Sequence, residues 1–173
     1  SLALIRQTLE VWTKESIAKK KQLNWIAICS DDSVGDIAKD DFVVLTQDLG
    51  IPVYGDSNSK EIKLWLKKPK IGLSVVFTTY QSGKVIAKAA KKEKIGFDLG
   101  IMDEAHKTVG KGERLFSHLL YEKNIKIKKR IFMTATERRY QGQSDNILTM
   151  ENPEVYGDTF ELLTFKEALK AKP

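Results

Sequence analysis

The residues of this chain best suited to chemistry are two carboxylates and a histidine that follow an apolar stretch. Residues 97–102 have the length and composition of a buried strand, and they are followed by Asp103-Glu104-Ala105-His106. One carboxylate in such a place can hold Mg²⁺ through its water shell, and the other can orient and deprotonate a water molecule. The same residues would also suit the acidic N-terminus of a helix, which the helix dipole favours. On their own, the four residues leave both interpretations open.

The composition is that of one globular domain of ordinary size. The chain has 173 residues, of which 42% are hydrophobic and 30% charged, so it can form a substantial core and is not a disordered chain. No apolar run is long enough to span a bilayer, and the amphipathic start differs from a signal peptide. The single cysteine, Cys29, excludes an internal disulfide and fits a reducing compartment. We therefore expect a cytoplasmic protein without a membrane partner.

Helical and strand-like segments alternate along the chain. Apolar spacing predicts helices over residues 1–20, about 59–66 (capped by Ser57 or Ser59), 83–93 and about 113–122. Short apolar runs predict strands over residues 25–29, 51–54, 73–77, 97–102 and 129–133, and residues 160–171 suggest a strand followed by a short helix. Residues 33–50 leave strand and helix open, and 140–146 suggest a loop. Near-continuous apolar strands that alternate with helices predict an α/β three-layer sandwich with a mostly parallel sheet.

Lysines and small polar residues occur at different places relative to the predicted strands. The basic runs are Lys19-Lys20-Lys21, Lys67-Lys68-Pro69-Lys70, Lys91-Lys92-Glu93-Lys94 and residues 126–130. Each follows a helix and precedes a strand, where cations complement the helix dipole. The net charge of +6 permits a polyanionic partner, but ligands of open parallel sheets bind at the opposite edge, where strands end. We therefore expect the lysine runs to be solvated partners of helix ends.

Hydroxyl and carboxylate side chains gather at the predicted strand ends. These ends carry Ser30-Asp31-Asp32, Asp56-Ser57, Thr78-Thr79-Tyr80-Gln81-Ser82, Asp103-Glu104-Ala105-His106 and Thr134-Ala135-Thr136. Such groups bind metal, position water or form hydrogen bonds with phosphates. The functional edge of the sheet is therefore predicted to be the one where its strands end.

Two of these strand ends resemble known motifs. Asp103-Glu104-Ala105-His106 and Thr134-Ala135-Thr136 resemble motifs II and III of superfamily 2 helicases. Residues 1–9 resemble motif Ia, and residues 78–82 resemble the motif Ib region. With Cys29-Ser30-Asp31 and Tyr156-Gly157, the chain is most similar to motor subunits of restriction enzymes and related predicted bacterial helicases. The resemblance covers nearly the whole chain as a first RecA-like domain, of the P-loop NTPase type.

The resemblance implies a role for each matching residue. Asp103 would hold the Mg²⁺ of bound ATP, and Glu104 would be the general base for the hydrolytic water. His106 would contact motif III or a second RecA-like domain, and Thr134 and Thr136 would couple hydrolysis to the nucleic acid. The phosphates of a nucleic-acid strand would be met by Ser1, Arg6, Gln7, Thr78, Thr79 and Gln81.

The chain lacks the phosphate loop of such motors. Gly83-Lys84-Val85 and Gly110-Lys111-Gly112 have neither the spacing nor the hydroxyl of G-x-x-x-x-G-K-[ST]. We therefore expect residues 1–173 to be a partial first RecA-like domain without its phosphate-loop strand. The parent would be an ATP-dependent translocase of a restriction-modification system, with double-stranded DNA, a second RecA-like domain and possible methyltransferase or specificity subunits as partners. The chain alone is expected not to hydrolyse ATP.

Two other functions remain open on the sequence. A Mg²⁺-dependent nuclease or phosphohydrolase would use Asp103, Glu104 and His106 directly, and it would need a further ligand such as Asp31 or Asp32. A degenerate scaffold would bind nucleic acid without catalysis. Tyr80 would stack on a base of a bound nucleic acid, although an aromatic residue that closes a strand more often belongs to the core.

Overall fold

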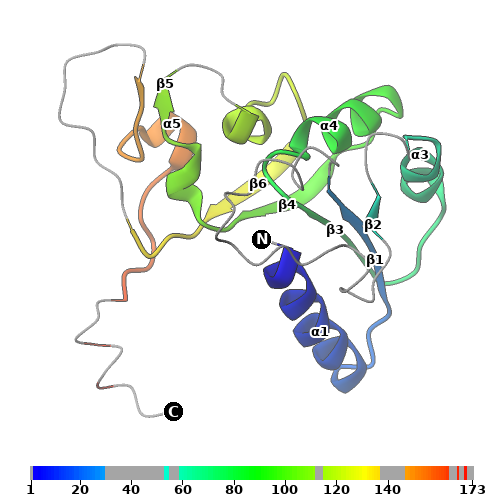
Figure 1. Cartoon of the computed structure of the whole chain (residues 1–173). Coiled ribbons are helices and arrows are strands. Elements are labelled where there is room, and N and C mark those ends of the chain that lie inside the picture. Colours follow the sequence, from blue (N-terminus) through cyan, green and yellow to red (C-terminus); the bar gives the residue numbers. More distant parts are fainter. Residues whose placement is uncertain are drawn as a thin grey trace, which may run out of the picture.

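The computed structural model describes residues 2–29, 53–54, 59–111, 115–136, 147–163, 167 and 170. Figure 1 shows its helices, which are α1 (Leu2–Ala18), α3 (Ser59–Lys67), α4 (Gly83–Lys92), α5 (Pro153–Tyr156) and the 3-10 helices η3 (Ala105–Thr108) and η4 (Leu115–Leu120). The strands are β1 (Leu23–Ile28), β2 (Val53–Tyr54), β3 (Leu73–Thr78), β4 (Phe97–Met102), β5 (Gly110–Lys111), β6 (Ile127–Phe132) and β7 (Ile147–Leu148). None of the helices in these ranges has the length and apolar character needed to cross a membrane.

The described strands form two parallel groups and one small antiparallel pair. In the first group β1 lies between β2 and β3, and both neighbours run parallel to it. In the second group β4 and β6 are parallel, whereas β5 and β7 pair in the antiparallel direction. None of the ladders among these strands joins β3 to β4. The parallel pairing follows the prediction, but the described sheet is divided into two.

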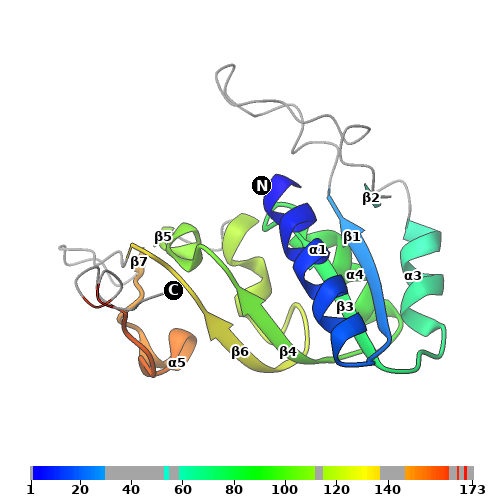
Figure 2. The same cartoon turned by 90° about the horizontal axis from the view of Figure 1, so that it is seen from below.

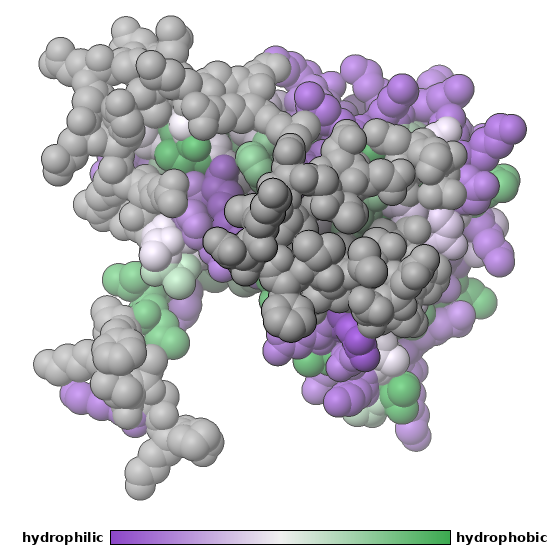
Figure 3. All heavy atoms as spheres, viewed as in Figure 1, coloured by the Kyte–Doolittle hydropathy of each residue, from purple (hydrophilic) through white to green (hydrophobic). Residues whose placement is uncertain are grey.

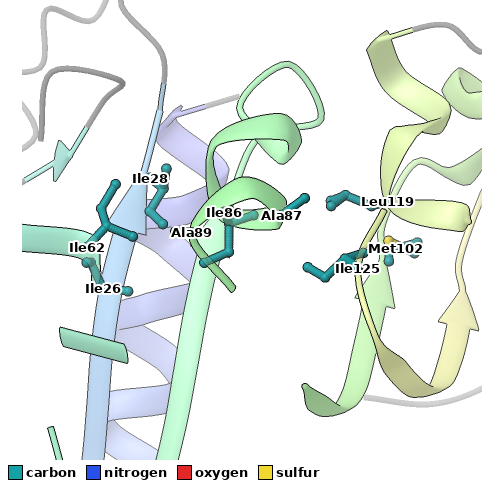
Figure 4. Close-up of a cluster of buried hydrophobic side chains, with 9 residues drawn as sticks. All are labelled: Ile26, Ile28, Ile62, Ile86, Ala87, Ala89, Met102, Leu119 and Ile125. Carbon is teal, nitrogen blue, oxygen red and sulfur yellow. The ribbon is translucent and has the colours of Figure 1, made fainter. Parts of the chain in front are cut away.

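The main core lies between the first sheet and the helices α3 and α4, and it extends to η4 and β4. Ile28 of β1 and Ile62 of α3 are completely buried. Figure 4 shows the whole cluster, which comprises Ile26, Ile28, Ile62, Ile86, Ala87, Ala89, Met102, Leu119 and Ile125. Because residues of both parallel groups belong to this one cluster, apolar packing holds the two groups together.

The opposite face of the first sheet is covered by α1. Ile26 faces the core cluster, so the alternation of a strand directs Ala27 to the other face. Phe77 of β3 is in register with Ala27, and Trp12 of α1 packs edge-on against it with ring centroids 6.0 Å apart. Helices therefore lie on both faces of this sheet, as the three-layer prediction requires.

Several predicted elements need correction. The helix predicted over residues 113–122 is the shorter 3-10 helix η4, since its apolar spacing suits either helix type. Residues 160–163 belong to no strand, because no described strand pairs with them, and Figure 3 shows hydrophobic residues exposed along this C-terminal stretch. The fourth basic run lies largely inside β6 instead of before it. The predictions for residues 30–50, Ser57 and residues 140–146 lie outside the described residues.

The first three basic runs lie where α1, α3 and α4 end, as predicted. Lys70 illustrates the role expected of them. Its Nζ donates to the carbonyl of Trp65 and, at 2.8 Å, to that of Lys68, and it lies 4.1 Å from the centroid of the Trp65 ring. This ammonium group therefore satisfies carbonyls at the end of α3, which a helix leaves without internal partners.

The turn before β3 requires the glycine at position 72. Gly72 has φ +84°, and a Cβ there would lie 2.3 Å from the carbonyl oxygen of Gln22, which accepts a hydrogen bond from Leu73 at 2.8 Å. We expect Gly72→Ala to lower the free energy of unfolding by about 1–3 kcal/mol, measured by urea denaturation. Gly96→Ala is the control, because its Cβ would make only ordinary contacts at 3.5 Å. Equal unfolding midpoints for the two variants would contradict this account.

Candidate active site

β4 ends in a turn that carries both candidate catalytic carboxylates. Asp103 is exposed, and 46% of the Glu104 side chain is exposed, so both can reach a ligand. Glu104 has a left-handed backbone with φ 52° and ψ 43°, and its N–H donates to Asp103 Oδ1 at 2.8 Å. The next residue, Ala105, is buried and donates its N–H to the carbonyl of Met133 at 2.9 Å. The turn, which we call the acidic turn (residues 103–106), is thus fixed to the segment after β6.

His106 connects the acidic turn to the end of β6. Its Nδ1 lies 2.9 Å from Thr134 Oγ1, 3.1 Å from Thr136 Oγ1 and 3.3 Å from Glu104 Oε2. Only 12% of the histidine side chain is exposed. The structure therefore brings together the residues assigned to catalysis and coupling from the sequence, although they come from two different strand ends.

The hydrogen bonds of Thr134 assign the tautomer of His106. The Thr134 hydroxyl donates to the carbonyl of Thr136 at 3.0 Å and accepts from its N–H at 3.2 Å. Since the hydroxyl proton is already used, Thr134 Oγ1 accepts the hydrogen bond from His106 Nδ1. In the neutral ring the proton is therefore on Nδ1, and Nε2 is an acceptor.

Thr108 and Tyr156 form a second pair of residues that stabilises the acidic turn. Thr108 Oγ1 donates to the carbonyl of Ala105 at 2.7 Å and lies 2.7 Å from the hydroxyl of Tyr156, which therefore acts as the donor to Thr108. The Tyr156 ring packs edge-on against Phe132 of β6 at 4.9 Å, and burial raises its pKa, which keeps the hydroxyl protonated. Sequence reasoning missed this support, because no spacing signal relates residues 108 and 156.

The residues expected to meet nucleic acid begin in α1. Arg6 and Gln7 are exposed, and Figure 2 shows the N-terminal end of α1 on the side of the molecule where β1 ends. Arg6 Nε pairs with Glu10 Oε1 at 3.0 Å, one turn further along the helix. Ser1 lies outside the described residues. Two of the expected contacts therefore lie on the edge predicted to be functional.

The remaining expected contacts lie at the end of β3 and directly after it, where several hydroxyls already have partners. Thr78 Oγ1 donates to the carbonyl of Thr79 at 3.1 Å, and Thr79 Oγ1 bonds to Ser82 Oγ at 2.9 Å. Burial raises the pKa of the Cys29 thiol to about 11, although hydrogen bonds with Thr79 act in the opposite direction. Cys29 is therefore a neutral buried side chain. Gln81 is half-buried.

The site offers few metal ligands. Within the described ranges, no three His, Cys, Asp or Glu side chains are grouped so that they could hold a metal ion. Asp31 and Asp32, which a nuclease would need in addition, lie outside those ranges. The exposed pair of Asp103 and Glu104 fits Mg²⁺, an ion that keeps several waters and takes only one or two carboxylates from a protein.

Comparison with solved structures relates the chain to known enzymes. A nuclease-deletion mutant of the type ISP restriction-modification enzyme LlaGI, in complex with a DNA substrate mimic, matches 98% of this chain with 31% identity and a TM-score of 0.70. This chain is similar to a part of the type ISP restriction-modification enzymes. A second member, the ATP-dependent enzyme LlaBIII bound to DNA, matches 94% of the chain with 23% identity and a TM-score of 0.60, which supports the fold.

The likeness to the type ISP enzymes confirms the expected fold class, a mixed α/β arrangement with parallel strands that forms part of a RecA-like domain. The chain spans 13% of the length of either solved enzyme. No protein-family model matches the chain, and no curated protein matches it.

Proposed function

We propose that residues 1–173 are part of the first RecA-like domain of an ATP-dependent motor that moves on double-stranded DNA in a restriction-modification protein. The observation that carries this proposal is the acidic turn, whose His106 contacts the hydroxyls of Thr134 and Thr136 at the next strand end. In a nucleotide-driven motor, such a contact passes a change at the nucleotide to a neighbouring segment. The likeness to LlaGI, solved with a DNA substrate mimic, supports DNA as the partner.

The acidic turn supplies the groups that phosphoryl transfer to water requires. Asp103 would hold Mg²⁺, which would neutralise phosphate charge, and Glu104 would orient the attacking water and accept its proton. His106 passes the state of this turn to Thr134 and Thr136. No phosphate loop of the G-x-x-x-x-G-K-[ST] type occurs in these 173 residues, so the cradle for the nucleotide phosphates must come from elsewhere in the protein.

The nucleic-acid side of the proposal involves two segments. Arg6 and Gln7 of α1, together with Ser1, and residues 78–82 at the end of β3 approach the phosphates of one strand. The hydroxyls of Thr78 and Thr79 also bond within their own segment, and Arg6 pairs with Glu10, so these groups exchange a protein partner for a phosphate when DNA binds. A second RecA-like domain, and methyltransferase or specificity regions, are the further partners we propose for a cytoplasmic enzyme of this kind.

Turnover of ATP with and without DNA tests this function. The complete protein should hydrolyse ATP, and linear double-stranded DNA should stimulate it, whereas the 173-residue chain should show no turnover because it lacks a phosphate loop. Mg²⁺-dependent cleavage of DNA by the 173-residue chain without nucleotide would instead support the nuclease alternative. DNA binding by a complete protein that never hydrolyses ATP would support the scaffold.

A further inference from the structure

Tyr80 lies where the chain leaves β3, and its hydroxyl reaches the end of β4. It donates to the main-chain carbonyl of Asp103 at 2.7 Å. β3 and β4 belong to different parallel groups, and none of the ladders among the described strands connects them. The Tyr80 hydrogen bond therefore joins the two groups at their strand ends, between the segment of residues 78–82 and the acidic turn.

The surroundings of Tyr80 keep its hydroxyl in place as a donor. Its ring packs edge-on against Phe116 of η4, with centroids 6.2 Å apart, and it lies partly buried against the core cluster. Since the ring is packed against η4 and the hydroxyl is bonded, this arrangement favours a structural link over the stacking of a base.

We propose that Tyr80 is a positioning residue that couples the binding of DNA to the acidic turn. This rests on the proposed function, in which residues 78–82 meet DNA and Asp103 and Glu104 serve ATP. The main chain of Tyr80 belongs to residues 78–82, while its hydroxyl holds the main chain of the acidic turn. Apolar packing joins the two groups at the core, and none of the ladders among the described strands ties β3 to β4. A small shift of residues 78–82 on DNA therefore reaches the carboxylates through the Tyr80 hydrogen bond.

Tyr80→Phe in the complete protein tests the proposal, because it removes the hydroxyl and keeps the ring that packs on Phe116. The stimulation of ATPase by saturating DNA, taken as the ratio of the rates with and without DNA, should fall on the order of tenfold relative to wild type. Thermal unfolding should match wild type. Tyr121→Phe is the matched control, since it removes the hydroxyl of a half-buried tyrosine outside both segments.

A binding measurement provides a readout that a merely structural role would not change. If DNA changes the affinity for nucleotide, a non-hydrolysable ATP analogue must change the affinity for DNA by the same factor. Wild type and Tyr121→Phe should show this effect in a DNA titration, and Tyr80→Phe should lose most of it while its affinity without nucleotide is unchanged.

Three results would overturn the coupling role. One is a Tyr80→Phe variant that keeps the stimulation and the nucleotide-dependent affinity of Tyr121→Phe. Another is an equal loss of the basal and stimulated rates, which would show that the hydroxyl only supports the acidic turn. A wild-type protein whose ATPase ignores DNA would overturn the proposed function itself, and the coupling role with it.

Discussion

Glu104→Gln in the complete protein is expected to lower ATP turnover by at least about a hundredfold, with nucleotide affinity changed by less than about threefold. The amide has the size of the carboxylate and retains one carbonyl oxygen, but it cannot accept a proton from the attacking water. The side chain is 46% exposed, so solvent and ligands have access to it. Steady-state ATPase with saturating DNA measures the first quantity, and titration with a fluorescent ATP analogue measures the second.

A matched control separates this chemistry from the loss of a negative charge. Glu61→Gln removes the charge of an exposed glutamate in the first turn of α3, and it should leave turnover close to wild type. Unchanged turnover in Glu104→Gln would exclude Glu104 as the general base. A parallel loss of nucleotide binding would instead assign Glu104 to holding the nucleotide.

Ile62→Ala is expected to cost about 2–5 kcal/mol of the free energy of unfolding of the 173-residue chain. Ile62 of α3 is completely buried in the cluster that includes Ile28 of β1 and Ile86 of α4, so truncation leaves a cavity between α3 and the first sheet. Leu64→Ala on the same helix is the control. Leu64 is 69% exposed, and its loss should change stability by less than about 1 kcal/mol.

Urea denaturation followed by circular dichroism measures both variants. Because the two substitutions lie in the same helix and both create alanine, the change in helix propensity is similar and the difference reports burial. A Leu64→Ala variant as unstable as Ile62→Ala would show that α3 does not pack on the sheet as described.

The sequence predicted the longer elements well, because their apolar residues form runs or recur at helical spacing. The runs did not reveal burial, since Leu99 and Ile101 of β4 are 47% and 44% exposed. The limits of β4 agree with the predicted residues 97–102. β5 and β7, with two residues each, are too short to produce any period. The absence of a ladder between β3 and β4 could not be predicted either, since the distance between two strands depends on how helices pack on the sheet.

The candidate site was predictable only in part. The resemblance led us to expect that His106 contacts either motif III or a second RecA-like domain, and its Nδ1 lies beside Thr134. The bonds of Tyr80 to Asp103 and of Tyr156 to Thr108 span 23 and 48 positions in the sequence. Such contacts join aromatic residues that sequence patterns assign to a core, so only the folded arrangement reveals them.

The left-handed backbone of Glu104 bears on the stability of the acidic turn. Asparagine and glycine adopt that conformation more easily, and for other residues it costs roughly 1–2 kcal/mol. Lys20 and Lys94 adopt the same conformation, with φ 50° and 55°, so it is not peculiar to this position. Under the proposed function, a glutamate here places its carboxylate at the site at the expense of a turn that glycine or asparagine would form more favourably.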